Sequence, residues 1–158
     1  MADFRKWVIL IAAVALFALV AHSQTLPADF IAAGVSYNQG ASPAIAGTGI
    51  YAHKALDGTY SISGVDILPT STNPLKTQTN TWTGVAQKVY TFGSVPIFAI
   101  AAGGSSTTGN NTGWAWTAGG GAPVPLGKGW VLMPCARYSK SSVADGRVIV
   151  GLLVGWGK

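Results

Sequence analysis

Few side chains in this sequence of 158 residues could act as nucleophiles, bases or metal ligands. His53 is the only histidine beyond the first 23 residues, and Cys135 is the only cysteine. A zinc site needs more ligands than these two side chains, and no serine lies in a motif that would complete a Ser–His–Asp triad with His53. We therefore expect no catalytic residue, no cofactor and no metal. His53 is interpreted as a rim residue and Cys135 as a small buried side chain.

A different chemistry is possible at the charged residues that lie within otherwise uncharged, strand-like segments: Asp66, Lys88, Arg137 and Arg147. A charge that faces lipid is costly, so in a membrane protein these side chains should face the interior and pair. Asp66, Arg137 and Arg147 are expected in the same half of the molecule, which permits an ion-pair network. Such a network would form a structural plug or, alternatively, line a narrow gated polar path.

The first 23 residues have the three parts of an export signal. Two basic residues precede an apolar run at 7–21, and the small residues Ala21 and Ser23 lie at its end, as a signal peptidase requires. The run is shorter than the roughly 20 apolar residues of a spanning helix. We predict a cleaved signal peptide at 1–23 and a single domain at 24–158, with an uncleaved N-terminal anchor as the alternative.

The predicted domain is poor in charge. Charged residues make up 9% of the sequence, against about 25% in a typical soluble domain. Lysine and arginine outnumber the acids, but they form no basic cluster with interleaved aromatics, so no nucleic-acid partner is predicted. One cysteine excludes an internal disulfide. Complete backbone pairing in a closed sheet would provide the stability that disulfides give to many exported domains.

Turn signals recur along the domain, and no stretch keeps a helical period. They delimit eight candidate strands, most of them close to the 9–11 residues of a tilted transmembrane strand: 29–37, 44–55, 59–68, 79–92, 95–104, 112–123, 129–139 and 147–156. The longer connections at 38–43, 69–78, 105–111 and 140–146 alternate with shorter ones at 56–58, 93–94 and 124–128. Short turns of outer-membrane barrels face the periplasm, so both termini are predicted there. Neither face of the candidate strand at 79–92 is clearly apolar, so the sequence does not predict which face is turned to the interior.

Aromatic residues lie near the ends of these candidate strands. With alternating strand directions, one group lies towards the predicted periplasmic rim: Phe30, Tyr60, Tyr90, Phe92, Phe98, Trp130 and Trp156. A second group lies towards the outer rim: Tyr37, Trp82, Trp114, Trp116 and Tyr138. Two such bands predict girdles at the membrane interfaces. The alternative is that aromatics flank turns, as they do in many β proteins.

The last candidate strand is the most specific. Alternate positions place one apolar, mostly branched set on a single face: Val148, Val150, Leu152, Val154 and Trp156. The chain thus resembles the small eight-stranded outer-membrane barrels, the class that includes the membrane domain of outer-membrane protein A. That family ends in an insertion signal read by the barrel-assembly machinery, and Gly151, Val154 and Trp156 match its glycine, apolar and aromatic positions. Ile149 departs from the expected polar position. Gly157 and Lys158 follow the aromatic and are expected beyond the last paired residue.

These patterns together predict an all-β fold, an eight-stranded antiparallel up-and-down transmembrane β-barrel in the outer membrane. Its role is predicted to be structural or surface-interacting, without catalysis, and its partners are outer-membrane lipid and, during insertion, the barrel-assembly machinery. The alternative is a secreted soluble β-sandwich that binds carbohydrate or another surface through exposed tryptophans. The sequence does not identify an external ligand.

Overall fold

The computed structural model describes residues 25–39, 44–69, 77–93 and 95–158. The predicted signal peptide and most of the predicted loops at 38–43 and 69–78 lie outside these residues. The described strands are β1 (Asp29–Gln39), β2 (Ala44–Lys54), β3 (Tyr60–Pro69), β4 (Thr77–Phe92), β5 (Val95–Thr108), β6 (Asn111–Gly121), β7 (Val124–Gly127), β8 (Trp130–Ser141) and β9 (Arg147–Gly157). No helix in the described residues is long and apolar enough to cross a membrane.

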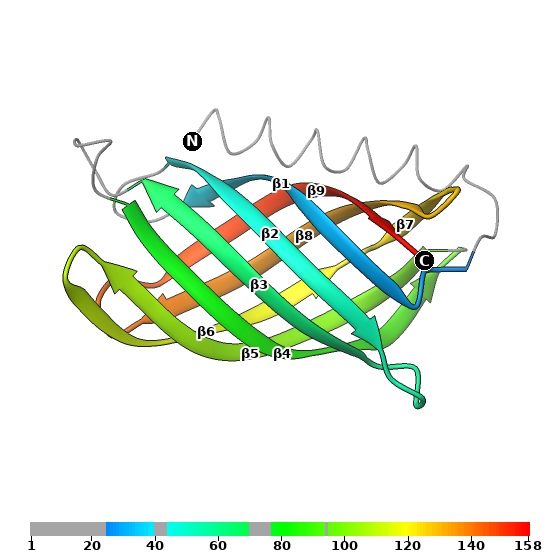
Figure 1. The fold of residues 1–158 in the computed structure, drawn as a ribbon, viewed down its shortest axis with the longest axis horizontal. Helices are drawn as coiled ribbons and strands as arrows, with labels where there is room; N and C mark the ends of the chain where they lie inside the picture. Colours follow the sequence, from blue (N-terminus) through cyan, green and yellow to red (C-terminus); the bar gives the residue numbers. More distant parts are fainter. Residues whose placement is uncertain (1–24, 40–43, 70–76, 94) are drawn as a thin grey trace.

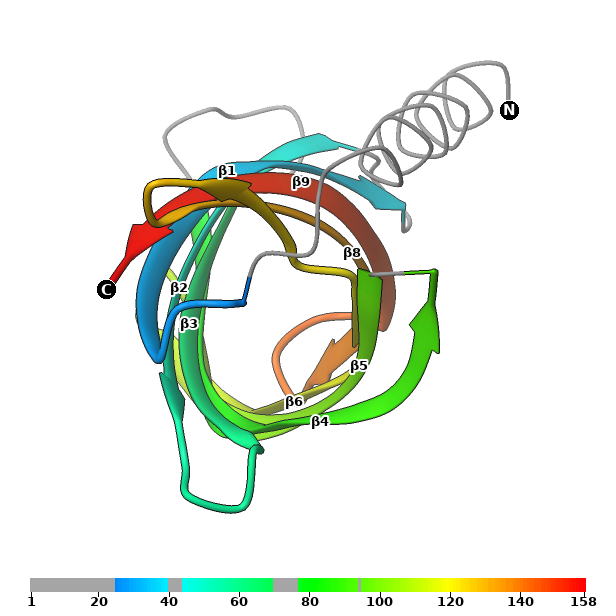
Figure 2. The same cartoon turned by 90° about the vertical axis from the view of Figure 1, so that its right-hand side faces the viewer.

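The strands form one closed antiparallel sheet (Figures 1 and 2). Their order is β6-β5-β4-β3-β2-β1-β9-β8-β7, and an additional pairing between β6 and β8 closes the ring. β6 and β7 both pair with β8, so they occupy one position in the barrel wall, which therefore has eight positions. The predicted barrel is confirmed, and the two-sheet sandwich is excluded because a single sheet closes on itself.

The predicted turn at 124–128 is wrong, because β7 occupies most of it. Pro123 and Pro125 have no N–H to donate to a ladder, which accounts for the break between β6 and β7. The turn itself is formed by Lys128 and Gly129, whose φ angles are 52° and 83°. Two successive positive φ angles are the requirement of a type I′ hairpin turn.

The predicted loop at 105–111 is also wrong. β5 continues to Thr108, and β6 begins at Asn111 after a two-residue turn. Hydroxyl groups pair across the neighbouring strands here, with 3.1 Å between the Oγ1 atoms of Thr107 and Thr112. A segment rich in Gly, Ser and Thr has the composition of a loop, but cross-strand hydroxyl pairs stabilise it as a ladder.

Both described chain ends lie at one end of the barrel, which we call the terminal end; the opposite end is the loop end (Figure 1). The amide of Asp29 donates to the carbonyl of Lys158 at 3.2 Å, and the amide of Lys158 donates back at 3.0 Å. Gly157 pairs with Phe30 within the ladder. The expectation that Gly157 and Lys158 lie beyond the last paired residue is therefore wrong.

Side chains alternate between the interior and the outer wall, as the strand period requires. In β9, Ile149 and Leu153 are fully buried, whereas Val148, Val154 and Trp156 are exposed on the outer wall. The interior has an apolar half near the terminal end and a polar half towards the loop end. The buried polar side chains are Ser36, Thr48, Asp66, Gln78, Asn80, Ser106, Thr117, Arg137, Ser139 and Ser141.

Four of the aromatics predicted at the two rims are not on the outer wall. Phe30, Tyr60 and Trp82 are 5%, 4% and 4% exposed and lie in the interior. Phe98, predicted at the periplasmic rim with Phe30 and Tyr60, is buried beside Tyr60, with 5.5 Å between the ring centroids. Position near a strand end specifies the height of a residue, whereas facing depends on its parity within the strand, and these four residues have interior parity.

The remaining predicted girdle residues face outward or lie part-way buried. Exposed side chains at or near strand ends are those of Tyr90, Phe92, Trp114, Trp130, Tyr138 and Trp156, and Tyr37 is half-buried. Trp116 is also exposed but lies in the middle of β6. β4 has a register shift between Lys88 and Tyr90. Before this bulge Trp82 and Ala86 face inward, whereas every residue from Gln87 to Phe92 is exposed. This change explains why the sequence of β4 did not predict which of its faces is turned to the interior.

Candidate functional site

An ion pair between Asp66 of β3 and Arg137 of β8 crosses the interior of the barrel. β3 and β8 are four positions apart in either direction around the ring of strands, so their inward side chains approach from opposite walls. Arg137 donates two hydrogen bonds to the carboxylate, from Nη1 to Oδ2 at 2.8 Å and from Nη2 to Oδ1. The two side chains are 2% and 0% exposed.

Neighbouring strands saturate this ion pair with hydrogen bonds. Trp82 Nε1 donates to Asp66 Oδ2 at 3.0 Å, and Thr48 Oγ1 donates to Asp66 Oδ1 at 2.9 Å. Because the single hydroxyl proton of Thr48 is used in this way, the Ser36 hydroxyl at 3.0 Å must donate to Thr48. The Arg137 guanidinium also lies 4.9 Å from the centroid of the Trp82 ring, within cation–π range.

A smaller polar group lies on the adjacent strands. Gln78 Nε2 donates to Asn80 Oδ1 and to Ser106 Oγ, both at 3.0 Å. These residues and the ion pair form what we call the polar layer, defined by Ser36, Thr48, Asp66, Gln78, Asn80, Ser106 and Arg137. Bidentate pairing and several additional donors are the conditions under which a buried ion pair is tolerated. The ion pair and its hydrogen bonds thus join β1, β2, β3, β4 and β8, and the Gln78 group joins β4 to β5.

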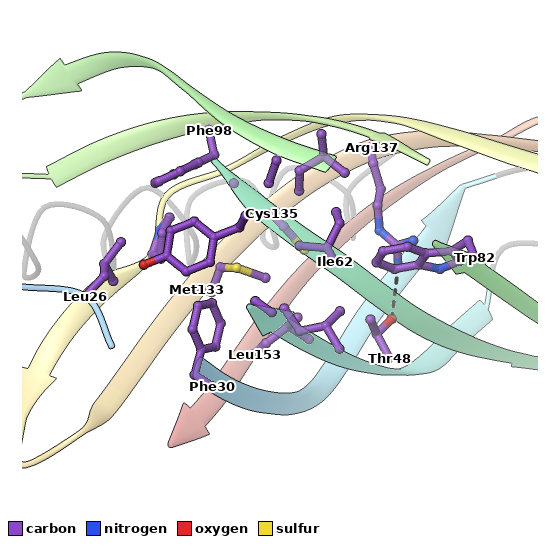
Figure 3. A pocket seen from close by; sticks show the side chains of 17 residues that line it. Leu26, Phe30, Thr48, Ile62, Trp82, Phe98, Met133, Cys135, Arg137 and Leu153 are labelled. Atoms are coloured by element: carbon purple, nitrogen blue, oxygen red, sulfur yellow. Dashed lines mark hydrogen bonds between the residues drawn. The ribbon is translucent and has the colours of Figure 1, made fainter. Parts of the chain in front are cut away.

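An apolar cavity of about 30 Å³ lies between the polar layer and the terminal end (Figure 3). Aromatic, aliphatic and sulfur-containing side chains line it, including Phe30, Ile62, Phe98, Met133 and Leu153. Its inner end is bounded by Thr48, Trp82 and Arg137. Leu26, in the segment before β1, lies at the other end and packs against this core.

A larger and more polar basin of about 480 Å³ opens at the terminal end. Leu26, Tyr60 and Phe98 line both the basin and the apolar cavity, so the two spaces adjoin at these side chains. Lys54 and Lys88 lie on the basin wall. The interior therefore changes from a polar layer to an apolar cavity and then to a basin with two lysines.

The structure brings together two of the three residues of the predicted ion-pair network. Asp66 contacts Arg137, whereas Arg147 starts β9 opposite Ser139 and has Asp145, in the preceding turn, as its charged neighbour. Asp145 is close to Arg147 in sequence, so this cation has a local partner that Arg137 lacks. The network is therefore a pair with hydrogen-bonding neighbours.

The residues of the predicted insertion signal lie on both faces of β9. Val154 and Trp156 are exposed on the outer wall, and Gly151 is buried on the inner face. A Cβ built at Gly151 would lie 2.8 Å from Cβ of Ser36, so glycine is needed for the close approach of β1 and β9.

Sequence reasoning missed Thr48, Trp82 and Lys54 as members of interior sites. Trp82 shares strand parity with Asn80 and Gln78, and this alternation of polar residues with an aromatic was the available signal. The expected inward facing of Lys88 agrees with its place opposite Phe98 and on the basin wall, but the expected pairing does not appear, because no ion pair joins Lys88 to a carboxylate among the described residues. Lys54 lies at a strand end, where a lysine is ordinarily solvated.

Gly64 gives a test of how tightly the polar layer is held. A Cβ on Gly64 would lie 2.1 Å from Cζ2 of Trp82, and the ring cannot move away without losing its hydrogen bond to Asp66. We expect Gly64→Ala to lower the free energy of unfolding by about 1–3 kcal/mol. Gly47→Ala is the control, since a Cβ there meets nothing within 4 Å. Urea unfolding in lipid vesicles would measure both; equal stabilities would contradict this account of Trp82.

Comparison with known proteins gives matches at the level of structure. No protein-family model matches the chain, and a search of curated proteins finds no match either. Neisserial surface protein A is similar with a TM-score of 0.64 at 9% identity, covering 82% of this chain and 96% of that one. A de novo designed transmembrane β-barrel gives 0.52 at 15% identity, covering 85% and 98%.

A third similar structure is the attachment invasion locus protein Ail of Yersinia pestis in complex with the heparin analogue sucrose octasulfate. Its TM-score is 0.54 at 11% identity, covering 84% of this chain and 98% of that one. Identities this low establish the fold and no further property. The closed ring of eight strand positions, with both described chain ends at one end, shows that the chain has the fold of the small outer-membrane β-barrel proteins.

Proposed function

We propose that this chain is a non-enzymatic outer-membrane protein with a structural or surface-interaction role, whose interior is closed by the polar layer. The main observation in support is the Asp66–Arg137 ion pair, which joins opposite walls and whose carboxylate also accepts hydrogen bonds from Trp82 and Thr48. A barrel of eight strands is just wide enough to be filled by its own side chains. Continuous passage of solutes is not expected.

The outer wall supports a membrane location. Large apolar side chains are exposed on several strands, among them Ile31, Val35, Ile67, Val85 and Val154. Exposed apolar surface of this extent is costly in water and suits contact with lipid. The outward-facing tryptophans and tyrosines near both rims would then lie at the two membrane interfaces.

We assign the orientation from the connections and the described chain ends. The turns between β2 and β3, β4 and β5, and β7 and β8 lie at the terminal end, which we assign to the periplasm. The loop end would then face outward and present any surface that contacts an external ligand. Ail, which shares the fold, was solved with a heparin analogue. Cleavage after Ser23 would precede insertion, with Gly151, Val154 and Trp156 presented to the barrel-assembly machinery.

The proposal predicts that the folded chain migrates differently on a gel before and after boiling. Closure leaves the ladder bonds internal, and lipid or detergent shields them, so cold detergent should not unfold the barrel. Cell fractionation should also place the protein in the outer membrane and show that detergent is needed to extract it. Identical mobility in both states, together with solubility in the absence of detergent, would refute the proposal.

A further inference from the structure

The basin at the terminal end contains two inward-directed cations. Lys54 is opposite Tyr60 in the ladder of β2 and β3, and Lys88 is opposite Phe98 in that of β4 and β5. Cross-strand partners share a face of the sheet, and both aromatic partners are buried in the interior. The lysines therefore lie on the inner face. Lys54 is on β2 beside Tyr60 of β3, and Lys88 is on β4, the strand between those of Tyr60 and Phe98.

Neither lysine is neutralised by another described residue, since no ion pair joins either of them to a carboxylate in the part of the chain that the structure describes. Asp57 lines the same basin but is engaged by Thr59, whose Oγ1 and backbone N–H donate to Asp57 Oδ1 at 2.6 Å and 2.9 Å. These hydrogen bonds hold the pKa of Asp57 below its ordinary value. The basin thus contains two cations and one carboxylate, and that carboxylate already accepts two hydrogen bonds from Thr59.

The floor of the basin is apolar and leads into the cavity. Leu26, Tyr60 and Phe98 line both spaces, and of these only Leu26 belongs to the short segment that precedes β1 and lies outside the strand ladder. Two hydrogen bonds attach this segment to the wall: Tyr60 Oη donates to the carbonyl of Pro27 at 2.9 Å, and Lys54 N donates to that of Ala28 at 2.7 Å. Leu26 therefore lies at the boundary between the basin and the cavity, on a segment that these two hydrogen bonds attach to the wall.

From this arrangement we propose that the terminal end binds an amphiphile with one hydrocarbon chain and an anionic head group, either a carboxylate or a phosphate. The head lies in the basin between Lys54 and Lys88, and the chain replaces Leu26 at the entrance of the apolar cavity. The present cavity of about 30 Å³ has room for about two water molecules, so binding requires Leu26 to withdraw. Met133, a flexible side chain in the cavity wall, can adapt to the chain.

Free fatty acids and single-chain phospholipids share this chemistry. The inference concerns the interior of the barrel and does not rest on the structural or surface role proposed above. It differs from a general affinity of the outer wall for lipid, because it requires two named cations and one entrance. These requirements can be varied one at a time.

The experiment uses the protein in phosphatidylcholine nanodiscs with ¹³C-methyl methionine, because Met133 is the only methionine beyond Met1 and lines the cavity. A Met133→Leu variant assigns the resonance. Addition of dodecanoate should shift the Met133 signal saturably, whereas dodecanol, which lacks the charge, should bind far more weakly. Lauroyl lysophosphatidic acid provides the second arm: a shift with either anion supports the site, and the tighter ligand identifies the source.

Matched variants separate the site from partition into lipid. The double variant Lys54→Gln/Lys88→Gln should weaken dodecanoate binding by about tenfold or more, since it removes two charge-assisted contacts. Lys140→Gln, an exposed lysine of β8, should leave it unchanged. Leu26→Ala should tighten it. Each variant is checked for the gel shift of a folded barrel, so a folded protein without a saturable shift, or with equal responses to dodecanoate and dodecanol, overturns this inference alone.

Discussion

Replacing Asp66 with leucine should destabilise the barrel by about 3–5 kcal/mol, the usual cost of leaving one member of a buried ion pair without its partner. Arg137 is 4% exposed and would remain charged in the interior. Its guanidinium donates twice to Asp66 and once, at 3.3 Å, to Thr48, so only the Thr48 hydrogen bond and the contact with the Trp82 ring would persist. Trp82 would lose its acceptor as well.

The double replacement Asp66→Leu/Arg137→Met should be milder than Asp66→Leu alone, because it removes both charges together. The measurement is urea unfolding of the protein in lipid vesicles, arranged as a double-mutant cycle. Lys140→Gln is the control, an exposed lysine of β8 whose replacement should change stability by no more than about 0.5 kcal/mol. Absence of coupling between Asp66 and Arg137 would refute the description of the polar layer as an ion-paired plug.

The barrel could be predicted from the sequence because its signal is distributed over the whole chain. Alternation in 147–156 specified which face of β9 is apolar, and the structure has Ile149 and Leu153 inside and Trp156 outside. The strands at 95–104 and 112–123 were predicted with wrong ends, because Ser, Thr and Gly between them form ladder pairs whose partners lie on other strands. Composition alone does not distinguish such a ladder from a loop.

The interior site was only partly predictable, for a geometric reason. A charge within a strand indicates an interior position, which pointed to Asp66, but the choice of its cation depends on which strands face each other across the ring. β3 and β8 do so only once the barrel closes with eight positions. Phe30, Tyr60 and Trp82 are predicted in the girdles because their nearness to a strand end was considered and the face of the strand on which they lie was not. The two basin lysines, on β2 and β4, share one space only because the ladders place them opposite Tyr60 and Phe98, a register that the sequence alone does not give.

Trp156→Ala should reduce the amount of folded protein in the outer membrane severalfold, and far more than Trp114→Ala. The two tryptophans are closely matched, since both face the outer wall, at 43% and 55% exposed, and each replacement removes one ring from the proposed interfaces. Only Trp156 occupies the aromatic position of the proposed insertion signal in β9. A difference in yield therefore measures recognition by the assembly machinery, beyond the anchoring that both rings provide.

The measurement is the heat-shifted fraction of the protein in isolated outer membranes, with each variant also refolded from urea into vesicles without the machinery. We expect the two variants to refold alike in vesicles and to differ only in cells. A chain that ends at Trp156 should refold less well in vesicles, because it lacks the Lys158 pairing with Asp29 and the bond from Gly157 N to Gly129 O at 2.9 Å. Equal yields of Trp156→Ala and Trp114→Ala in cells would remove the insertion-signal role of Trp156 while leaving the barrel itself intact, because the closed ladder, with β9 paired to both β1 and β8, does not depend on that ring.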